Sequence, residues 1–322
     1  MSRILVTGGS GFIGTNLIQA YLDRGETVAN FDAAAPADAR QVPYWRQVDI
    51  LDAGALQREM DVFRPDLIFH MAARTDLRGP VVEAYSANTQ GVRNLIGAAR
   101  RIEHLKRVIF ASSMLVCRMG YVPQDEFDYQ PGTCYGESKV IGEKIVRQEA
   151  ADAFEWCIVR PTSIWGPWFG APYRNFFEAV KKGIYFHPMG KCVRRTYGFV
   201  LNSVFELIQL ASCDAKRMHG KTFYLADYEP LELQAWSNLV AHAMGRRPIR
   251  AMPLFVFKCA AKVGDGLQRL GMSTPPMSSF RLHNMLTDMI HDTRHLQDIC
   301  GPLPYTPAEG VRLTVEWMRQ HG

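Results

Sequence analysis

The first seventeen residues, MSRILVTGGSGFIGTNL (Met1–Leu17), decide the fold of this 322-residue chain. The stretch opens with a short apolar run typical of a buried parallel strand: Ile4, Leu5 and Val6. Glycines then follow at three-residue steps into an amphipathic segment: Gly8, Gly11 and Gly14. A strand, a glycine turn and a helix in this order cradle a pyrophosphate on the free N–H groups of the helix start. The stretch therefore predicts a dinucleotide-binding unit.

An acidic residue follows at the distance that such a unit requires. The segment Thr27–Phe31 is predicted as a second strand, and it ends at Asp32, eighteen residues after Gly14. A carboxylate there accepts hydrogen bonds from an adenosine ribose and repels a 2'-phosphate. Residues 33–35 are alanines and offer no basic group to a phosphate. The sequence therefore favours NAD over NADP.

Composition narrows the class of protein. The chain is 47% hydrophobic and 21% charged, which is typical of one large or two medium globular domains. Its net charge of +5 comes from basic residues that look scattered, so nucleic acid is not an expected partner. Seven cysteines without metal-ligand spacing predict no metal site and a reducing compartment. The sequence shows neither a leader nor an apolar run long enough to span a bilayer, and a cytoplasmic protein is expected.

Polar residues come at the ends of the later predicted strands. A short strand is predicted to end at Val48–Asp49–Ile50, which places Asp49 where it meets an adenine edge. Val108–Ala111 delivers Ser112 and Ser113 to the carboxyl edge of the sheet, where open α/β folds bind their ligands. The strand Asp66–Met71 closes on two small residues that leave room for a cofactor, and its His70 is expected to be a core residue rather than a ligand.

Tyr135 and Lys139 form the second half of the predicted site. They stand four residues apart at the start of a predicted helix, so both project from one face. A free phenol is a poor base at neutral pH, but a neighbouring ammonium and an oxidised nicotinamide both favour the phenolate. With Ser113 on the same substrate oxygen, the group is suited to taking hydride and a proton from a secondary alcohol.

In this order the motifs resemble those of the extended short-chain dehydrogenases/reductases, in the branch of NAD-dependent sugar-nucleotide epimerases and dehydratases. The resemblance spans nearly the whole chain and rests on TGGSGFIG (7–14), Asp49–Ile50, HMAA (70–73), Asn88, Ser112–Ser113, Tyr135-xxx-Lys139, RPTSIWGP (160–167) and RTYGFVLN (195–202). The expected fold is α/β, a Rossmann-type doubly wound parallel sheet with a smaller C-terminal α/β substrate-binding domain.

The resemblance implies a role for each matching residue. Catalysis falls to Ser113, Tyr135 and Lys139. Cofactor contacts fall to Gly8, Gly11, Phe12, Ile13, Gly14, Asp32, Asp49, Ile50, Met71, Ala72, Ala73, Asn88, Tyr135, Lys139, Pro161 and Thr162. Substrate contacts fall to Ser112, Ser163, Arg174 and Arg195; Arg195 is expected at a substrate diphosphate, with Arg194 as the alternative.

Departures from the family pattern restrict the reaction. Met114 and Leu115 occupy the places where dehydratases and related decarboxylases carry acidic residues, so neither reaction is favoured. Sugar epimerases often carry asparagine at Ser163, tyrosine at Trp165 and Cys117, and aspartate at Asn202. The substrate pocket is therefore expected to differ more from the family than the cofactor site does.

The domain organisation follows from the same reading. Residues 1–167 are expected to bind NAD, and residues 168–322 mainly the substrate, with a return to the first domain around 196–210. Phe176 and Phe177 are expected to lie on a helix and to fill the core, while the roles of Trp168 and Tyr173 stay open between core packing and stacking on a base. Thr222–Leu225 is predicted as a strand of the smaller domain. Met252–Leu270 is predicted as a core helix, with contact to a membrane surface as the weaker alternative. The resemblance also implies a homodimer through the helices predicted at 83–101 and 135–148.

Three functions remain open from the sequence. The first is an epimerase at C4 of a sugar linked to a nucleoside diphosphate or a polyprenyl diphosphate, acting through a 4-keto intermediate. The second is a net NAD(P)-dependent oxidoreductase of a ketosugar or, less favoured, of a steroid-like alcohol. The third is a non-catalytic NAD-binding protein, which the intact catalytic residues argue against. Asp32 favours the first over the second, because reductive biosynthesis commonly uses NADPH.

Overall fold

The computed structural model describes residues 2–151, 153–272, 275 and 277–321. Its centre is a seven-stranded sheet in the order β3-β2-β1-β4-β5-β6-β11, with every neighbouring pair parallel. The strands are β1 (Arg3–Thr7), β2 (Thr27–Asp32), β3 (Trp45–Gln47), β4 (Leu67–His70), β5 (Arg107–Ala111), β6 (Glu155–Pro161) and β11 (Thr222–Leu225). The strand order reverses between β1 and β4, which confirms the predicted Rossmann-type fold.

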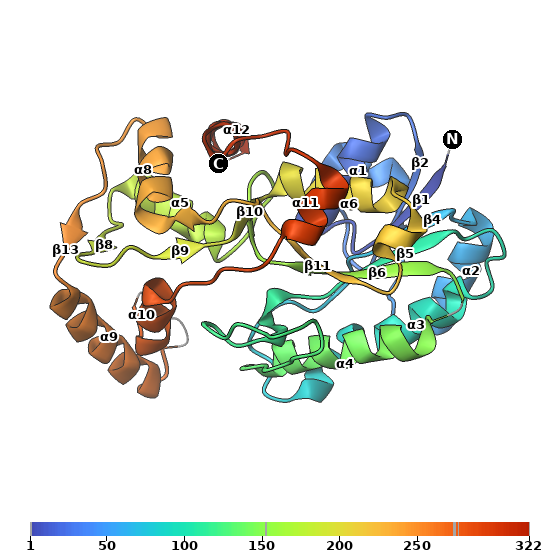
Figure 1. The fold of residues 1–322 in the computed structure, drawn as a ribbon, viewed down its shortest axis with the longest axis horizontal. Helices are drawn as coiled ribbons and strands as arrows, with labels where there is room; N and C mark the ends of the chain where they lie inside the picture. The colour runs from blue at the N-terminus through green and yellow to red at the C-terminus, as the bar shows by residue number, and fades with distance from the viewer. Residues whose placement is uncertain (1, 152, 273–274, 276, 322) are drawn as a thin grey trace.

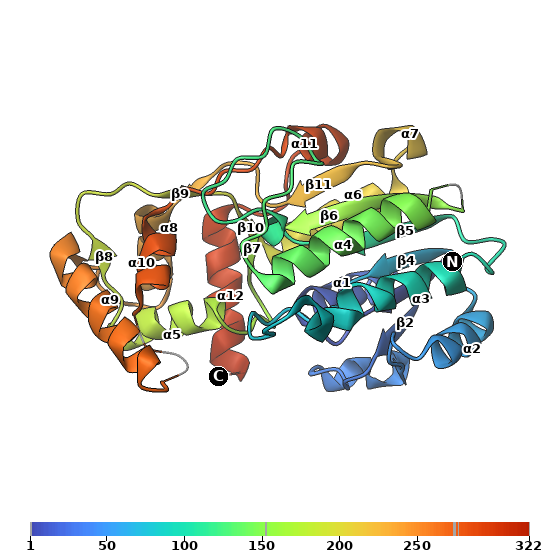
Figure 2. The same cartoon turned by 90° about the horizontal axis from the view of Figure 1, so that it is seen from below.

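Helices cover both faces of this sheet, because its strands are apolar on both sides. Leu5 of β1 packs on one face with α2 (Ala53–Phe63), α3 (Gln90–Ala99) and α4 (Cys134–Glu149). Its neighbours Ile4 and Val6 pack on the other face with α1 (Phe12–Leu22), α6 (Val200–Ser212) and α11 (Arg294–Cys300). Figure 1 shows these two layers above and below the sheet, and Figure 2 looks onto α3 and α4.

Three local predictions are corrected. The strand Thr222–Leu225 is β11, an edge strand of the main sheet rather than of the smaller domain, because it pairs with β6. The helix expected over 83–101 is divided into η2 (Val82–Asn88) and α3, with a kink at Tyr85 and an irregular backbone at Thr89. The strand expected to end at Ile50 ends three residues earlier, at Gln47.

A smaller α/β region continues the chain beyond the sheet. Its helices are α5 (Tyr173–Lys182), α8 (Leu233–Ala243) and α12 (Pro307–His321). Its short strands form three pairs: β7 (Ser163–Trp165) with β10 (Tyr197–Phe199), β9 (Arg194–Arg195) with β12 (Leu231–Glu232), and β8 (His187–Pro188) with β13 (Ala251–Met252). Its apolar core is aromatic: Trp165 packs against Phe177, Phe199 and Trp236. Phe177 is fully buried on α5, as predicted.

The segment predicted as a core helix lies at the periphery. It forms α9 (Leu254–Arg269), which packs on α10 (Ser279–Leu286) at the end of the molecule away from the N-terminus (Figure 1). One stripe of α9 is buried, at Phe257, Ala261 and Gly264, so the core-helix prediction is wrong for the rest of its surface. None of the helices in the described ranges is both long and apolar enough to cross a membrane. Short helical turns complete the fold: η1 (Ala39–Tyr44), η3 (Met114–Val116) and α7 (Ala215–Met218).

Candidate active site

The glycine turn after β1 is shaped by close backbone contacts. Gly8 has a φ of +70°, and a Cβ on it would lie 2.5 Å from the amide nitrogen of Ala72. A Cβ on Gly14 would lie 2.6 Å from the Gly8 carbonyl oxygen, so only glycine lets α1 approach the turn. α1 begins at Phe12 without a side-chain cap, which leaves N–H groups at its start to bind an anion. The turn therefore fits the pyrophosphate of a dinucleotide.

Asp32 closes β2 beside this turn. Its Oδ2 accepts a hydrogen bond from the Ser10 amide at 3.0 Å, and its Oδ1 accepts one from the Ala34 amide at 2.9 Å. These bonds hold the carboxylate at the wall of a large cavity, where the remaining lone pairs can accept ribose hydroxyl hydrogens.

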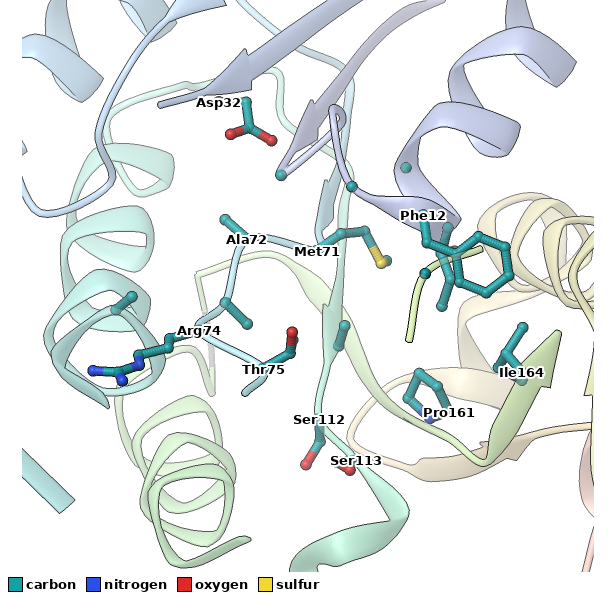
Figure 3. A pocket seen from close by; sticks show the side chains of 18 of the residues that line it. Phe12, Asp32, Met71, Ala72, Arg74, Thr75, Ser112, Ser113, Pro161 and Ile164 are labelled. Atoms are coloured by element: carbon teal, nitrogen blue, oxygen red, sulfur yellow. The ribbon is translucent and has the colours of Figure 1, made fainter. Parts of the chain in front are cut away.

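The cavity has a volume of about 790 Å³ and runs along the carboxyl ends of the strands (Figure 3). Every residue predicted to contact the cofactor lines it, with the exception of Asn88. Asp32 and the glycine turn lie at one end, and Pro161 lies at the other with Ser112 and Ser113 nearby (Figure 3). Ala72 and Ala73 keep the middle of the cavity wide, as their size predicts.

Asn88 acts behind the cavity wall instead. Its Oδ1 accepts from the Arg74 amide at 2.9 Å, and its Nδ2 donates to the Arg74 carbonyl oxygen at 3.0 Å and to Ser138 Oγ at 2.9 Å. These bonds join the loop after β4 to α4. Asn88 therefore braces the strand ends through backbone contacts and does not reach the cavity.

Three polar side chains gather on the cavity wall where β5 ends. Ser113 follows β5, and Tyr135 and Lys139 lie on the first turns of α4. The Ser113 hydroxyl hydrogen-bonds the phenol of Tyr135. Lys139 Nζ donates to the carbonyl oxygen of Ala111 at 2.9 Å, which fixes the ammonium against the end of β5. The structure therefore brings the three predicted catalytic residues to one place.

Burial sets the acid–base properties of this group. It raises the pKa of Tyr135, although the hydrogen bond with Ser113 acts in the opposite direction. It lowers the pKa of Lys139 to about 8, against the charge of Glu143, which favours the ammonium. The pKa of Tyr135 thus shifts in the direction opposite to the one expected from the Lys139 ammonium. In the protein alone Tyr135 holds its proton at neutral pH and is a donor.

Only some of the residues predicted to contact the substrate line the cavity. Ser112 lines the cavity, and its buried hydroxyl has no protein partner. Ser163 lies in β7 against the Tyr173 hydroxyl, and Arg174 lies over the ring of Trp317 at 5.8 Å. Neither lines the cavity.

The arginine expected at a substrate diphosphate is also away from the cavity. Arg195 is buried in β9, and its Nη2 donates to the Thr287 carbonyl oxygen at 3.2 Å, whereas the alternative Arg194 is exposed. Tyr173 lines the cavity and is close enough to feel the charge of Arg195. The sequence could predict that an arginine lies near a strand, but it could not predict the direction in which its side chain points.

The cavity wall also contains residues that the sequence analysis missed. Arg74 and Thr75 follow Ala73 directly. Their position just after a predicted strand could have marked them as residues at the ligand-binding edge of the sheet. Arg74 turns its guanidinium away from the cavity (Figure 3), toward Asp76 Oδ2 at 2.7 Å and the Ala84 carbonyl oxygen at 2.9 Å. It is therefore paired within the protein.

The segment 168–173 forms the rest of the wall. Trp168 and Tyr173, whose role was left open from the sequence, both line the cavity, together with Phe169 between them. Trp168 has a φ of +69°, which is strained for a side chain of this size. Together with Ile164, these residues make this end of the cavity largely apolar.

A buried ion pair stands behind Lys139. Arg160 Nε and Nη2 each donate to a Glu143 carboxylate oxygen at 2.8 Å, and both side chains are 1% exposed. The Tyr129 hydroxyl donates to the same carboxylate at 2.9 Å. Because Glu143 lies one turn after Lys139, the pair fastens the catalytic helix α4 to β6.

His70 lies in the core, as expected. Thr7 Oγ1 hydrogen-bonds its Nδ1 at 2.7 Å, and burial lowers its pKa to about 3, so the ring is neutral.

Fold and site together define an enzyme of the extended short-chain dehydrogenase/reductase type. Residues 4–184 match the NAD dependent epimerase/dehydratase family. The chain is 32% identical to the 3 beta-hydroxysteroid dehydrogenase/Delta 5→4-isomerase of Mycobacterium tuberculosis H37Rv, over 77% of this chain and 70% of the relative. It is 28% identical to the N-acetyl-alpha-D-glucosaminyl-diphospho-ditrans,octacis-undecaprenol 4-epimerase of Escherichia coli O157:H7, over 99% and 96%.

Solved structures agree on the fold. The UDP-glucose 4-epimerase of Thermus thermophilus in complex with NAD superposes with a TM-score of 0.72 at 23% identity, over 98% of this chain and 99% of that chain. The chain belongs to the NAD-dependent epimerase/dehydratase family. It is an enzyme, and its cofactor is NAD.

Proposed function

We propose that this protein is an NAD-dependent epimerase acting at C4 of a diphosphate-linked sugar through a transient 4-keto intermediate. The observation that carries the proposal is the grouping of Ser113, Tyr135 and Lys139 on the wall of the cofactor cavity. A hydroxyl, a phenol and an ammonium placed together can move one proton at a secondary alcohol.

Each side chain has one task in this proposal. Ser113 hydrogen-bonds the substrate oxygen. Tyr135, whose phenolate is favoured by the charges of an oxidised nicotinamide and of Lys139, takes the proton from that oxygen and returns it. Lys139 holds the nicotinamide ribose and stabilises the phenolate. The glycine turn and Asp32 hold the pyrophosphate and the adenosine ribose, as the close contacts at Gly8 and Gly14 support. NAD held in this way would supply the hydride acceptor and donor that the reaction at C4 requires.

The residues after Ser113 favour epimerisation over dehydration or decarboxylation. Met114 and Leu115 stand in η3, which Ser113 caps by accepting a hydrogen bond from the Leu115 amide at 3.1 Å. Neither side chain can act as an acid or a base. Hydride removal and return therefore remain as the reaction that these residues can support.

A polyprenyl diphosphate is the carrier that we favour, with a nucleoside diphosphate as the alternative. The Escherichia coli relative, named for an undecaprenol-linked sugar, matches 99% of this chain. Tyr173 lines the cavity and feels the charge of Arg195, which is the basic residue that we propose for the diphosphate.

A net oxidoreductase of an apolar secondary alcohol is the second candidate function. The observation that favours it is the apolar wall of Ile164, Trp168 and Phe169. Among the described residues, Arg74 is the one arginine that lines the cavity, and it is already paired with Asp76. The mycobacterial relative is named a hydroxysteroid dehydrogenase. The same Ser113, Tyr135 and Lys139 would serve this reaction.

One labelling experiment separates the two functions. Purified protein is incubated without added cofactor with UDP-, GDP-, dTDP- and CDP-sugars and with undecaprenyl-diphosphate-linked N-acetylglucosamine, each deuterated at C4. An epimerase yields the C4 isomer with the deuterium retained. Transfer of the label to added NAD, a need for stoichiometric NADH, or oxidation of a 3β-hydroxysteroid would instead establish the oxidoreductase.

A further inference from the structure

The positive charge of this protein is concentrated in one segment. Residues 244–286 contain seven Lys and Arg side chains and a single acidic one, Asp265. Their net charge is +6 while that of the whole chain is +5, which leaves the remaining residues at −1. Basic residues that look scattered along the chain therefore give one strongly positive region, which contains α9 and α10.

The exposed side of α9 carries two adjacent rows of side chains. At 100° per residue, an apolar row falls within about 80° of the helix circumference: Phe255, Cys259, Val263 and the C-cap residue Leu270. A basic row falls within the adjoining sector of about 40°: Lys258, Lys262 and Arg269. The apolar row faces solvent, with Phe255 67% exposed, Val263 63% and Leu270 85%.

The protein itself does not cover these rows. The opposite side of α9 packs on α10 through Phe257, Ala261 and Leu282. Within the described ranges, Lys258 and Lys262 form no ion pair. The exposed face of α9 therefore has exposed apolar area and two lysines that no described acidic side chain pairs with, while Arg269 lies within electrostatic range of Asp265.

We propose that this face of α9 docks on the surface of an anionic phospholipid bilayer. The apolar row would enter the boundary between headgroups and acyl chains, and the basic row would remain among the anionic headgroups. A nucleic acid would match the lysines but leave Phe255, Val263 and Leu270 exposed. An interfacial helix accounts for both rows at once.

The position of α9 is compatible with catalysis at the membrane surface. Figure 1 places α9 and the N-terminus at opposite ends of the molecule, and neither α9 nor α10 contributes to the cavity wall. A bilayer at this face therefore leaves the cofactor cavity uncovered. The inference rests on the surface of α9 and stands whichever substrate the site takes.

Vesicle flotation of the full-length protein tests the proposal. The wild type is expected to float with phosphatidylcholine vesicles that contain phosphatidylglycerol, and to float poorly with phosphatidylcholine alone. Phe255→Ser with Val263→Ser should abolish most of the binding. Lys258→Gln with Lys262→Gln should lower the partition coefficient roughly thirty-fold, from about 1 kcal/mol for each lysine near an anionic surface.

Matched controls come from the exposed surface of the sheet domain. Val62→Ser removes an equally exposed apolar side chain from α2, and Arg58→Gln with Arg101→Gln removes two exposed charges. Both should float like the wild type. Unchanged NAD binding by all variants verifies their fold, since none of these residues lines the cavity.

A probe within the face gives a second measurement. Cys259 lies in the apolar row and is exposed, so in a Cys192→Ser background it can carry a polarity-sensitive fluorophore. A blue shift on anionic vesicles supports insertion of this face. The proposal is overturned by absence of binding, by α9 variants that float like the wild type, or by duplex DNA that binds as tightly whether or not Phe255 and Val263 are present.

Discussion

At the residue scale, we expect the carboxylate of Asp32 to decide the preference for NAD over NADP. The wild type should bind NAD at least about tenfold more tightly than NADP, because charged hydrogen bonds of this kind contribute about 1.5–3 kcal/mol. Asp32→Ala should reduce this ratio toward one. Because Asp32 also holds the Ser10 amide, the variant loosens the glycine turn for both cofactors, and the ratio isolates the effect of the charge. Calorimetric titration of both cofactors measures it, and equal affinities in the wild type would show that Asp32 does not contact the ribose.

Tyr135 should be required for turnover but not for cofactor binding. Tyr135→Phe keeps the packed ring and removes the proton-transferring oxygen, so the rate should fall roughly 10²–10⁴-fold while NAD affinity stays near that of the wild type. Lys139→Ala should damage both, since Lys139 is proposed to hold the ribose as well. Tyr85→Phe is the matched control, because its ring lies 6.0 Å from that of Tyr135 while its hydroxyl bonds the backbone. A Tyr135→Phe enzyme that keeps most of its rate would remove the phenol from the mechanism.

At the scale of elements, the attachment of α4 to β6 depends on the buried pair of Arg160 and Glu143. Glu143→Ala leaves the Arg160 guanidinium buried without its carboxylate, which should lower the free energy of unfolding by about 3–5 kcal/mol. Glu316→Ala, which breaks the exposed Arg312 pair on α12, should change it by less than about 1 kcal/mol. Urea unfolding compares the two, and equal effects would show that the buried pair does not fasten α4.

Local sequence patterns predicted the elements that form the proposed cofactor cavity. The glycine spacing, the acid after β2 and the serines after β5 each follow from chemistry within one short segment, and they reach the same cavity. The pairing of β11 with β6 joins residues about sixty positions apart, so no local pattern could assign that strand to the main sheet. For α9 the sequence favoured a core helix over contact with a membrane surface, because an apolar stretch does not reveal which of its sides finds a partner.

The substrate end of the site was the least predictable. Ser163, Arg174 and Arg195 were placed from their positions in motifs, but their side chains turn to Tyr173, Trp317 and Thr287. Those partners come from α5, α12 and the segment after α10. The direction of a side chain depends on such tertiary neighbours, which the sequence of the motif does not contain.

At the scale of the whole molecule, a buried carboxyl pair connects segments that are distant in sequence. Asp227 Oδ1 accepts from the Phe199 amide at 3.2 Å and from Asn202 Nδ2 at 2.8 Å, and Asn202 also donates to the Tyr305 carbonyl oxygen. Burial raises the pKa of Asp227 to about 7. Burial and the charge of Asp227 raise the pKa of Glu206, which is fully buried on α6.

This pair should make the protein less stable as the pH rises from about 4 to about 7. In that range the unfolded chain releases the Asp227 proton while the folded protein retains it, so stability falls by up to about 1.4 kcal/mol per pH unit, or about 4 kcal/mol in total. Asp227→Asn keeps an oxygen acceptor and removes the titration, so its stability relative to the wild type should increase across this range. Urea unfolding at several pH values measures the difference, and parallel curves for the two proteins would contradict the assignment.

The predicted homodimer can be tested at one glycine. Outward positions on the α3 and α4 layer are polar or small, among them Arg93, Gly97 and Lys144, and a Cβ on Gly97 would meet nothing within 4 Å. The folded monomer should therefore accept Gly97→Trp, whereas a two-fold interface formed by α3 would bring the new ring against its own copy. Sedimentation equilibrium should show a wild-type dimer whose dissociation constant the variant raises at least about tenfold.

Gly266→Trp is the matched control, because it places the same ring on α9, where a Cβ also meets nothing within 4 Å. A monomeric wild type, or a dimer that Gly97→Trp leaves intact, would exclude α3 as the interface.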